Sequence, residues 1–153
     1  MPRVQRSAEV TWEGNVARGS GALSAQSGAF QALPYTLASR IGAPEGKTSP
    51  EELLAAAHAG CYAMSLAGEL AQAGTPADRV ELTATVTLDE VDGGSHQIVA
   101  SEIRGSVRAP GVDASELERA AGAADEGCPF SSLIKKSGTV TVNVELEGGA
   151  NGD

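Results

Sequence analysis

The sequence predicts an α+β protein in which antiparallel sheets wrap around one long, buried central helix. Segments with alternating apolar and polar residues occur on both sides of the middle of this 153-residue chain, which is typical of half-buried strands. One long apolar segment runs from Thr48 to Gly74. Between Leu53 and Leu66 this segment is apolar or small on nearly every face, as buried helices are. Because so few strands cannot cover such a helix alone, we expect an intertwined homodimer.

The N-terminal part of the chain predicts two strands followed by a long connection. Residues 4–12 place Ala8, Val10 and Trp12 on one face, and residues 16–25 return after the turn Glu13-Gly14-Asn15. Residues 27–47 are rich in glycine and proline, so we expect an irregular connection with a short strand near 35–40. A connection of this length in a compact domain is often functional.

The central helix has clear sequence signals at both of its ends. Ser49 is the expected N-cap, Pro50 takes the first helical position, and Glu52 completes a capping box with Ser49. Gly74, followed by Pro76, ends the helix.

The rest of the chain predicts a hairpin, two helices and a last strand. Residues 80–89 alternate strictly, and a turn at residues 92–94 leads into a returning strand. Asp113 or Ser115 caps a helix that ends near Glu126, and Cys128-Pro129 begins a shorter one before the strand at residues 139–146. We expect residues 1–147 to form a single domain and residues 148–153 to be a disordered tail.

Charge and composition exclude several classes of partner. The net charge of -9 argues against binding to nucleic acid or to an anionic membrane. The five aromatic residues are too few for base-stacking platforms (Trp12, Phe30, Tyr35, Tyr62 and Phe130). The first ten residues do not resemble a signal peptide, and no run of about 18 apolar residues could span a bilayer. We therefore expect a cytoplasmic protein, in which two cysteines are either inert or redox-active.

The two cysteines, Cys61 and Cys128, carry the most unusual chemistry in the sequence. Spacing alone favours Cys128 as the reactive thiol, because an N-cap position stabilises a thiolate, whereas burial in a helix suppresses one at Cys61. Cys61 needs a nearby cation to react. His58 precedes it by three residues, but a histidine in a buried helix is more often a core residue. Two arginines are the other candidates, Arg40 in the long connection and Arg18 in a glycine-flanked turn.

Three segments resemble the osmotically inducible protein C and organic hydroperoxide resistance family. They are GKTSPEELLAAAHAGCYAMSL around Cys61, EGCPFSSLIK around Cys128, and the opening WEGNVARGSG. The resemblance runs from Val10 to Leu146 and is closest to the OsmC branch, which the stretch PYTLASR ending at Arg40 also fits. It implies an OsmC-like fold.

The resemblance also implies a thiol peroxidase that reduces organic hydroperoxides in the response to oxidative and osmotic stress. Cys61 would be the peroxidatic thiol and Cys128 the resolving thiol, with a disulfide between them as the product. Arg40 would activate Cys61 and Glu51 would orient Arg40, whereas in the sister branch the arginine matches Arg18. An external dithiol, carried by a lipoylated or thioredoxin-like protein, would reduce the disulfide, and neither a metal nor another cofactor is required.

The spacing of Glu51 and Cys61 bears on the expected homodimer. They are ten residues apart, which is about 15 Å along a helix, so one arginine cannot easily bridge them within one chain. We therefore expect Arg40 and Glu51 of one protomer to serve the thiols of its partner. Two other functions stay open: a non-enzymatic module that binds an apolar ligand, and a Cys–His hydrolase that uses Cys61 and His58.

Overall fold

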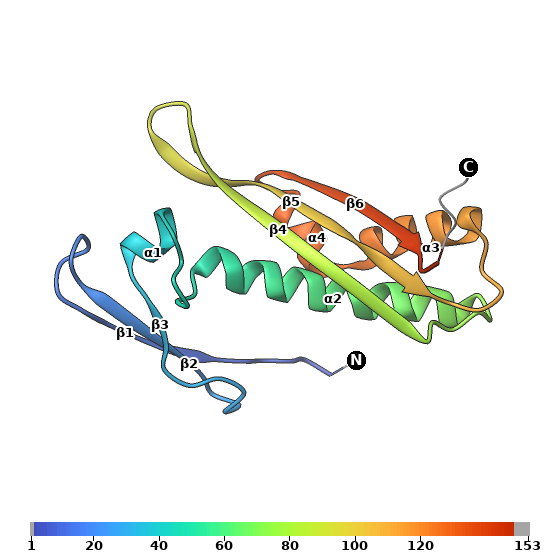
Figure 1. The fold of residues 1–153 in the computed structure, drawn as a ribbon, viewed down its shortest axis with the longest axis horizontal. Helices are drawn as coiled ribbons and strands as arrows, with labels where there is room; N and C mark the ends of the chain where they lie inside the picture. Colours follow the sequence, from blue (N-terminus) through green and yellow to red (C-terminus); the bar gives the residue numbers. More distant parts are fainter. Residues whose placement is uncertain (1, 149–153) are drawn as a thin grey trace. The chain divides into compact units, whose positions relative to one another are not determined.

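A computed structural model describes residues 2–148, so residues 149–153 of the expected tail lie outside the described part. The chain clusters into two compact units, Met1–Leu53 and Leu54–Asp153. Each unit has one three-stranded sheet, which confirms the α+β class (Figure 1). The assignment of residues 1–147 to a single domain stays a prediction.

The N-terminal unit is an antiparallel sheet followed by a short helix. Strand β1 (Ala8–Glu13) pairs with β2 (Ser20–Ala25), and β2 pairs with β3 (Leu33–Tyr35). Helix α1 (Leu37–Ile41) follows directly. The prediction of a short strand near residues 35–40 is therefore wrong for the residues after Tyr35, which lead into a helix. A capping box overrides it, because the Thr36 hydroxyl accepts from the Ser39 amide and the Ser39 hydroxyl accepts from the Thr36 amide, each at 3.0 Å.

Strand β1 differs from the half-buried strand that its alternation predicts. All six of its residues are exposed, including Val10 and Trp12 at 53% and 36%. Trp12 does contact Tyr35 of β3, with the ring centroids 5.4 Å apart. This contact lies over Gly21, where a Cβ atom would lie 2.3 Å from the Tyr35 ring. The glycine thus lets the two aromatic rings meet across the sheet.

Helix α2 (Pro50–Gln72) begins at the predicted residue and ends two residues before Gly74. The Ser49 hydroxyl accepts from the Glu52 amide at 3.2 Å, while the Glu52 carboxylate accepts from the Thr48 hydroxyl at 2.9 Å. Only one half of the expected Ser49–Glu52 box is therefore formed. At the other end Gly74 adopts φ +83°, and the Thr75 amide donates to the Leu70 carbonyl at 3.0 Å.

Within one chain, α2 is buried along one face only. The buried residues recur every fourth position (His58, Tyr62, Leu66 and Leu70). Met64, on another face, is 79% exposed. Burial on all sides, which the sequence predicts, is not reached by a single chain.

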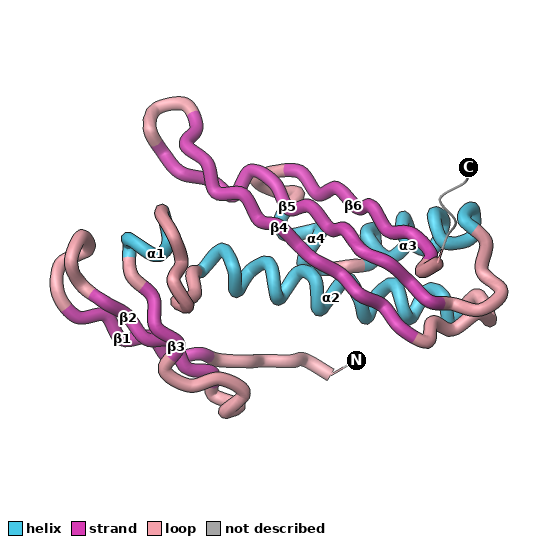
Figure 2. The backbone as a smooth tube through the Cα atoms, in the orientation of Figure 1, coloured by secondary structure: helices cyan, strands magenta, loops and turns pink. Residues whose placement is uncertain are grey.

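The C-terminal unit contains the larger sheet. Strands β4 (Arg79–Val91) and β5 (Ser95–Arg108) form a long antiparallel hairpin with an irregularity at Thr87/Leu88. Strand β6 (Thr139–Leu146) pairs with β5 in parallel, which corrects the expectation of an antiparallel sheet here. The physical reason is the connection, because two helices intervene between β5 and β6 and provide a crossover. The hairpin tip extends beyond β6 (Figure 2).

The two intervening helices complete the core of this unit. Helix α3 (Ala114–Gly127) is capped by Asp113, one of the two predicted caps, and α4 (Pro129–Ile134) begins at Cys128. One cluster of buried side chains joins α2, β5, α3 and the start of α4; it includes Tyr62, Leu66, Leu70, Ile103, Val107, Leu117, Ala124 and Cys128. Among the described helices, none combines the length and the hydropathy that crossing a membrane requires.

Candidate functional site

The two thiols meet within the C-terminal unit. Cys61 lies on α2 at the edge of the buried cluster, and Cys128 belongs to that cluster as the N-cap of α4. Both are free cysteines, and Cys61 packs against the cluster that contains Cys128. A pair of thiols 67 positions apart in the chain is thus assembled by tertiary packing.

The surroundings of Cys61 hold it as a protonated thiol. Burial raises the pKa of Cys61, and the hydrogen bond and charge of Cys128 raise it further. The backbone amide of Phe130, at the start of α4, acts in the opposite direction and lowers this pKa. The C-terminal unit by itself therefore contains one group that favours the Cys61 thiolate, but it does not outweigh burial.

Accessibility reverses the order of reactivity that spacing alone predicts. Cys128 is 0% exposed, whereas Cys61 is only partly buried. Within one chain, solvent therefore has more access to Cys61 than to Cys128. The N-cap position of Cys128 favours a thiolate through the backbone of α4, but the core of the C-terminal unit covers this residue.

His58 is a fully buried core residue with partners on both ring nitrogens. Its Nδ1 lies 2.7 Å from Ser101 Oγ on β5, and its Nε2 lies 2.8 Å from Ser131 Oγ on α4. Burial lowers its pKa; the charge of Asp125 opposes this shift and that of Lys135 adds to it, so the ring is neutral at pH 7. A hydrolase of the Cys–His type needs one ring nitrogen on the nucleophile, and here both are bonded to serines.

Arg40 and Glu51 form an ion pair in the N-terminal unit. Arg40 stands in the last turn of α1 and Glu51 in the first turn of α2. Arg40 Nε donates to Glu51 Oε1 and Oε2 at 3.0 and 3.1 Å, and Nη2 donates to Oε1 at 2.5 Å. This two-pronged geometry fixes the plane of the guanidinium group.

The ion pair shifts the pKa of both groups. Burial alone would raise the pKa of Glu51, but the hydrogen bond and charge of Arg40 outweigh it and lower this pKa. The hydrogen bond to Glu51 raises the pKa of Arg40. Both groups are therefore charged at pH 7. Arg18, the other candidate arginine, is exposed in the turn between β1 and β2, and its backbone amide donates to Asn15 Oδ1 at 2.9 Å.

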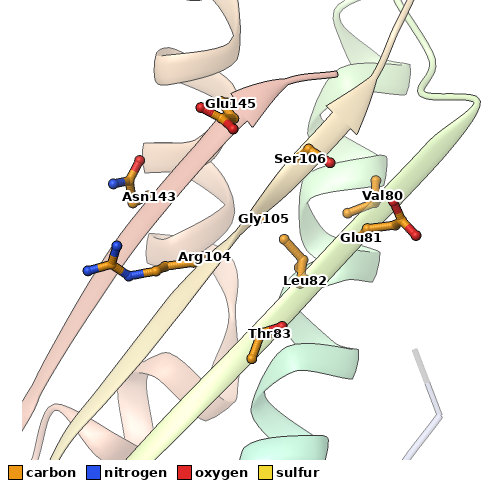
Figure 3. Close-up of a pocket in the computed structure, with 9 residues that line it drawn as sticks. All are labelled: Val80, Glu81, Leu82, Thr83, Arg104, Gly105, Ser106, Asn143 and Glu145. Carbon is orange, nitrogen blue, oxygen red and sulfur yellow. The ribbon is translucent and has the colours of Figure 1, made fainter. Parts of the chain in front are cut away.

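Two pockets bear on the location of the site. One of about 330 Å³ adjoins Arg40 and has a mainly apolar lining in the N-terminal unit (Trp12, Val16, Tyr35, Thr36, Leu37 and Arg40). A larger one of about 770 Å³ lies over the C-terminal sheet, where Glu81, Arg104, Asn143 and Glu145 contribute to its lining (Figure 3). Neither cysteine lines either pocket, and of these two pockets only the smaller one includes a candidate site residue, Arg40. Within residues 2–148, no group of three or more His, Cys, Asp or Glu side chains could hold a metal ion.

Comparison with known proteins identifies the family of this chain. The family described as OsmC-like protein matches residues 42–143, which contain both cysteines. The chain belongs to the OsmC-like protein family. It is 35% identical to the peroxiredoxin OsmC of Escherichia coli over 144 residues, covering 94% of this chain and 98% of that protein. It is also 36% identical to the organic hydroperoxide resistance protein OhrA of Bacillus subtilis over 108 residues, covering 67% of this chain and 69% of that protein.

The OsmC-like fold is confirmed by solved structures. An organic hydroperoxide resistance protein from Elizabethkingia anophelis aligns over 96% of this chain and all of that chain, with a TM-score of 0.76 and 20% identity. An OsmC structure from Legionella pneumophila aligns over 94% of this chain and 99% of that chain, with a TM-score of 0.74 and 20% identity. These similarities concern the fold.

Sequence reasoning did not find all the polar groups around the thiols. The partners of His58, Ser101 and Ser131, come from β5 and α4 and carry no local signal. The Phe130 amide was also missed, although its position two residues after an N-cap cysteine is a signal that could have found it.

Proposed function

We propose that this protein is a thiol peroxidase that reduces organic hydroperoxides to alcohols. The observation that carries the proposal is that Cys61, which is partly exposed, packs against the cluster that contains the fully buried Cys128. Relatives along most of the chain are called a peroxiredoxin and organic hydroperoxide resistance proteins, which supports the same chemistry.

The two thiols divide the reaction into two steps. In the first, the Cys61 sulfur attacks the O–O bond, the alcohol leaves, and Cys61 becomes a sulfenic acid. In the second, the Cys128 sulfur attacks Cys61, the S–O bond breaks, and a disulfide and water form. An external dithiol from a lipoylated or thioredoxin-like protein then reduces the disulfide. The burial of Cys128 supports its role as the resolving thiol, because it is protected from direct oxidation.

The role we assign to Arg40 is to ionise Cys61 and to stabilise the charge that develops on the peroxide oxygens. The C-terminal unit leaves the pKa of Cys61 raised, so the thiolate needs an added positive charge. Glu51 holds the guanidinium group in one plane through contacts of 2.5–3.1 Å. Since ten residues of helix separate Glu51 from Cys61, we assign this charge to the partner's Arg40.

In the proposed homodimer, the second copy covers apolar side chains that a single chain leaves exposed. Met64 on α2 is 79% exposed, and β1 leaves Val10 and Trp12 exposed. A second copy of the chain would remove these side chains from water, at about 25 cal/mol per Å² of apolar area. Light scattering tests this directly: we expect a dimer for the natural chain and dissociation for Met64→Glu, and a monomeric natural chain would contradict the assignment.

The pocket beside Arg40 indicates the kind of peroxide. Its lining of Trp12, Val16, Tyr35 and Leu37 is apolar, and its volume of about 330 Å³ exceeds what hydrogen peroxide fills. An alkyl or aryl group would bury apolar surface there, and its peroxide oxygens would then lie near the guanidinium group. We therefore propose organic hydroperoxides in preference to hydrogen peroxide.

Single-turnover oxidation tests the proposed function. With cumene hydroperoxide, the natural protein should form the Cys61–Cys128 disulfide, which mass spectrometry of peptides identifies. Cys128→Ser should still be oxidised once, at Cys61, but should not turn over with a dithiol reductant. Cys61→Ser should not consume peroxide above the rate without protein. If Cys61→Ser consumed peroxide as fast as the natural protein, the proposal would be wrong, and a binding module with incidental thiols would take its place.

A further inference from the structure

His58 is a buried titratable residue that the proposed reaction does not use. Its imidazole bridges Ser101 Oγ at 2.7 Å and Ser131 Oγ at 2.8 Å, so it links β5 to α4. All three side chains are at most 1% exposed. A neutral imidazole has one donor and one acceptor nitrogen, and a hydroxyl can take either role, so both bonds form together.

The contact between His58 and Ser131 lies next to the contact between the thiols. His58 precedes Cys61 by three residues on α2, and Ser131 follows Cys128 by three residues on α4. Along segments that run in opposite directions, His58 is thus bonded to Ser131 and Cys61 packs against the cluster that holds Cys128. Three residues of α-helix rise only about 4.5 Å, so a fixed contact at one position limits the separation at the other.

Helix α4 is held by tertiary contacts, among which the bond between His58 and Ser131 is a buried side-chain hydrogen bond to α2. It has only six residues, and Cys128 makes no side-chain capping hydrogen bond to it. A helix this short is not stable in isolation, so tertiary contacts must hold it in place. The other end of the bridge is firmly held, because Ser101 lies on the central strand β5 between Val86 of β4 and Val140 of β6.

We propose that His58 is a positioning residue for disulfide formation, an inference that rests on the proposed peroxidase function. By holding Ser131, His58 holds α4 where Cys128 contacts Cys61. When Cys61 is a sulfenic acid, the Cys128 sulfur attacks it, an S–S bond forms, the S–O bond breaks, and the departing hydroxide takes the Cys128 proton as water. Without the bridge, the sulfenic acid persists, and a second hydroperoxide oxidises it to sulfinic acid while becoming an alcohol.

A pair of hydroxyl deletions tests this role. Ser131→Ala removes the bond between His58 and α4, whereas Tyr62→Phe removes an equally buried hydroxyl that ties α2 to Ala121 of α3 at 2.9 Å. Both variants are mixed with cumene hydroperoxide, and samples quenched over time are assayed for sulfenic acid by dimedone labelling and for disulfide by mass spectrometry. We expect closure of the disulfide to slow about ten-fold in Ser131→Ala, which corresponds to one net hydrogen bond, with sulfenic acid accumulating. Tyr62→Phe should close the disulfide at nearly the natural rate.

A second pair keeps the test decisive if Ser131→Ala does not fold. The amide of glutamine reaches about as far as the imidazole Nε2, so His58→Gln can still contact Ser131. The shorter amide of asparagine reaches about as far as Nδ1, so His58→Asn can contact only Ser101. Each variant keeps one of the two bonds, so a merely structural role predicts equal rates of closure, whereas positioning of α4 predicts slower closure in His58→Asn.

The outcomes separate this inference from the proposed function. If the natural protein forms the disulfide but Ser131→Ala closes it as fast as Tyr62→Phe does, or if His58→Asn closes it as fast as His58→Gln, the role of His58 is wrong and the peroxidase stands. If the natural protein forms neither sulfenic acid nor disulfide, the proposed function fails first.

Discussion

The ion pair of Arg40 and Glu51 allows a sharp test of how the candidate site is held together. The variant Glu51→Gln removes the negative charge but keeps the shape of the side chain. Its neighbour Glu52 provides a matched control, because Glu52→Gln changes the net charge equally and its oxygen can still accept from the Thr48 hydroxyl. Any difference between the two variants therefore measures the contribution of the ion pair between Glu51 and Arg40.

The structure gives the size of the expected effect on stability. Arg40 makes contacts of 2.5–3.1 Å with the Glu51 carboxylate, and hydrogen bonds to charged groups contribute about 1.5–3 kcal/mol when they are well buried. The Arg40 side chain is 37% exposed, so solvent screens the pair, and we expect Glu51→Gln to lose about 1 kcal/mol in the free energy of unfolding. Urea denaturation measures this loss, and Glu52→Gln should show less than half of it.

The pH dependence of this loss has a definite sign. The pKa of Glu51 is lowered in the folded protein, so the ion pair stabilises the fold above the ordinary glutamate pKa of 4.5. This contribution disappears as the pH falls through the lowered value. The difference between the natural protein and Glu51→Gln should therefore be constant at neutral pH and shrink as the pH falls below about 4.5.

The expected effect on activity is larger than that on stability. If Glu51 aims Arg40 of its own chain at the Cys61 sulfur of the other protomer, its loss should slow the first oxidation about ten- to one-hundred-fold, since small displacements of a catalytic group have effects of this size. Stopped-flow measurement of the reaction with cumene hydroperoxide gives this rate. Equal rates for Glu51→Gln and Glu52→Gln would refute the assignment of Glu51 as the residue that orients Arg40.

Two further predictions concern the thiol pair and the C-terminal sheet. Cys128 raises the pKa of Cys61, so Cys128→Ala should shift the pH profile of Cys61 alkylation by iodoacetamide to lower pH; an unchanged midpoint would contradict the contact between the thiols. At Gly105 a Cβ atom would lie 1.9 Å from the Glu81 carbonyl oxygen, so Gly105→Ala should lower the free energy of unfolding by about 3 kcal/mol or more. Gly122→Ala, on an exposed face of α3 with open space around it, should instead raise the free energy of unfolding by about 0.5–1 kcal/mol. Similar effects at both glycines would contradict the close approach of Gly105 to the Glu81 carbonyl.

Local sequence signals predicted much of the secondary structure. The bounds of α2 follow from Ser49-Pro50 at one end and Gly74 at the other, because caps act through backbone groups a few residues away. The hairpin of β4 and β5 likewise follows from strict alternation around a glycine-rich turn. Helix α1 does not follow from the sequence analysis, which places Thr36 and Ser39 in a short strand near residues 35–40, although the two residues form a complete capping box.

Other features could not follow from the sequence alone. The parallel pairing of β6 depends on the path that α3 and α4 take across the sheet, which alternation within one strand does not specify. The burial of Cys128 depends in the same way on the core that covers the start of α4.

The sequence by itself determined the extent of the central helix and the identity of the two candidate thiols, because periodicity, caps and residue type are local properties. Only the tertiary structure decided which sulfur solvent can reach and what surrounds it. Cys128, the more reactive thiol on backbone grounds, is fully buried, whereas Cys61 is only partly buried. The bonds of His58 to Ser101 and Ser131 were likewise decided by packing, since they join residues 43 and 73 positions apart. Contacts at such separations form when strands and helices assemble into one core, and no local pattern encodes them.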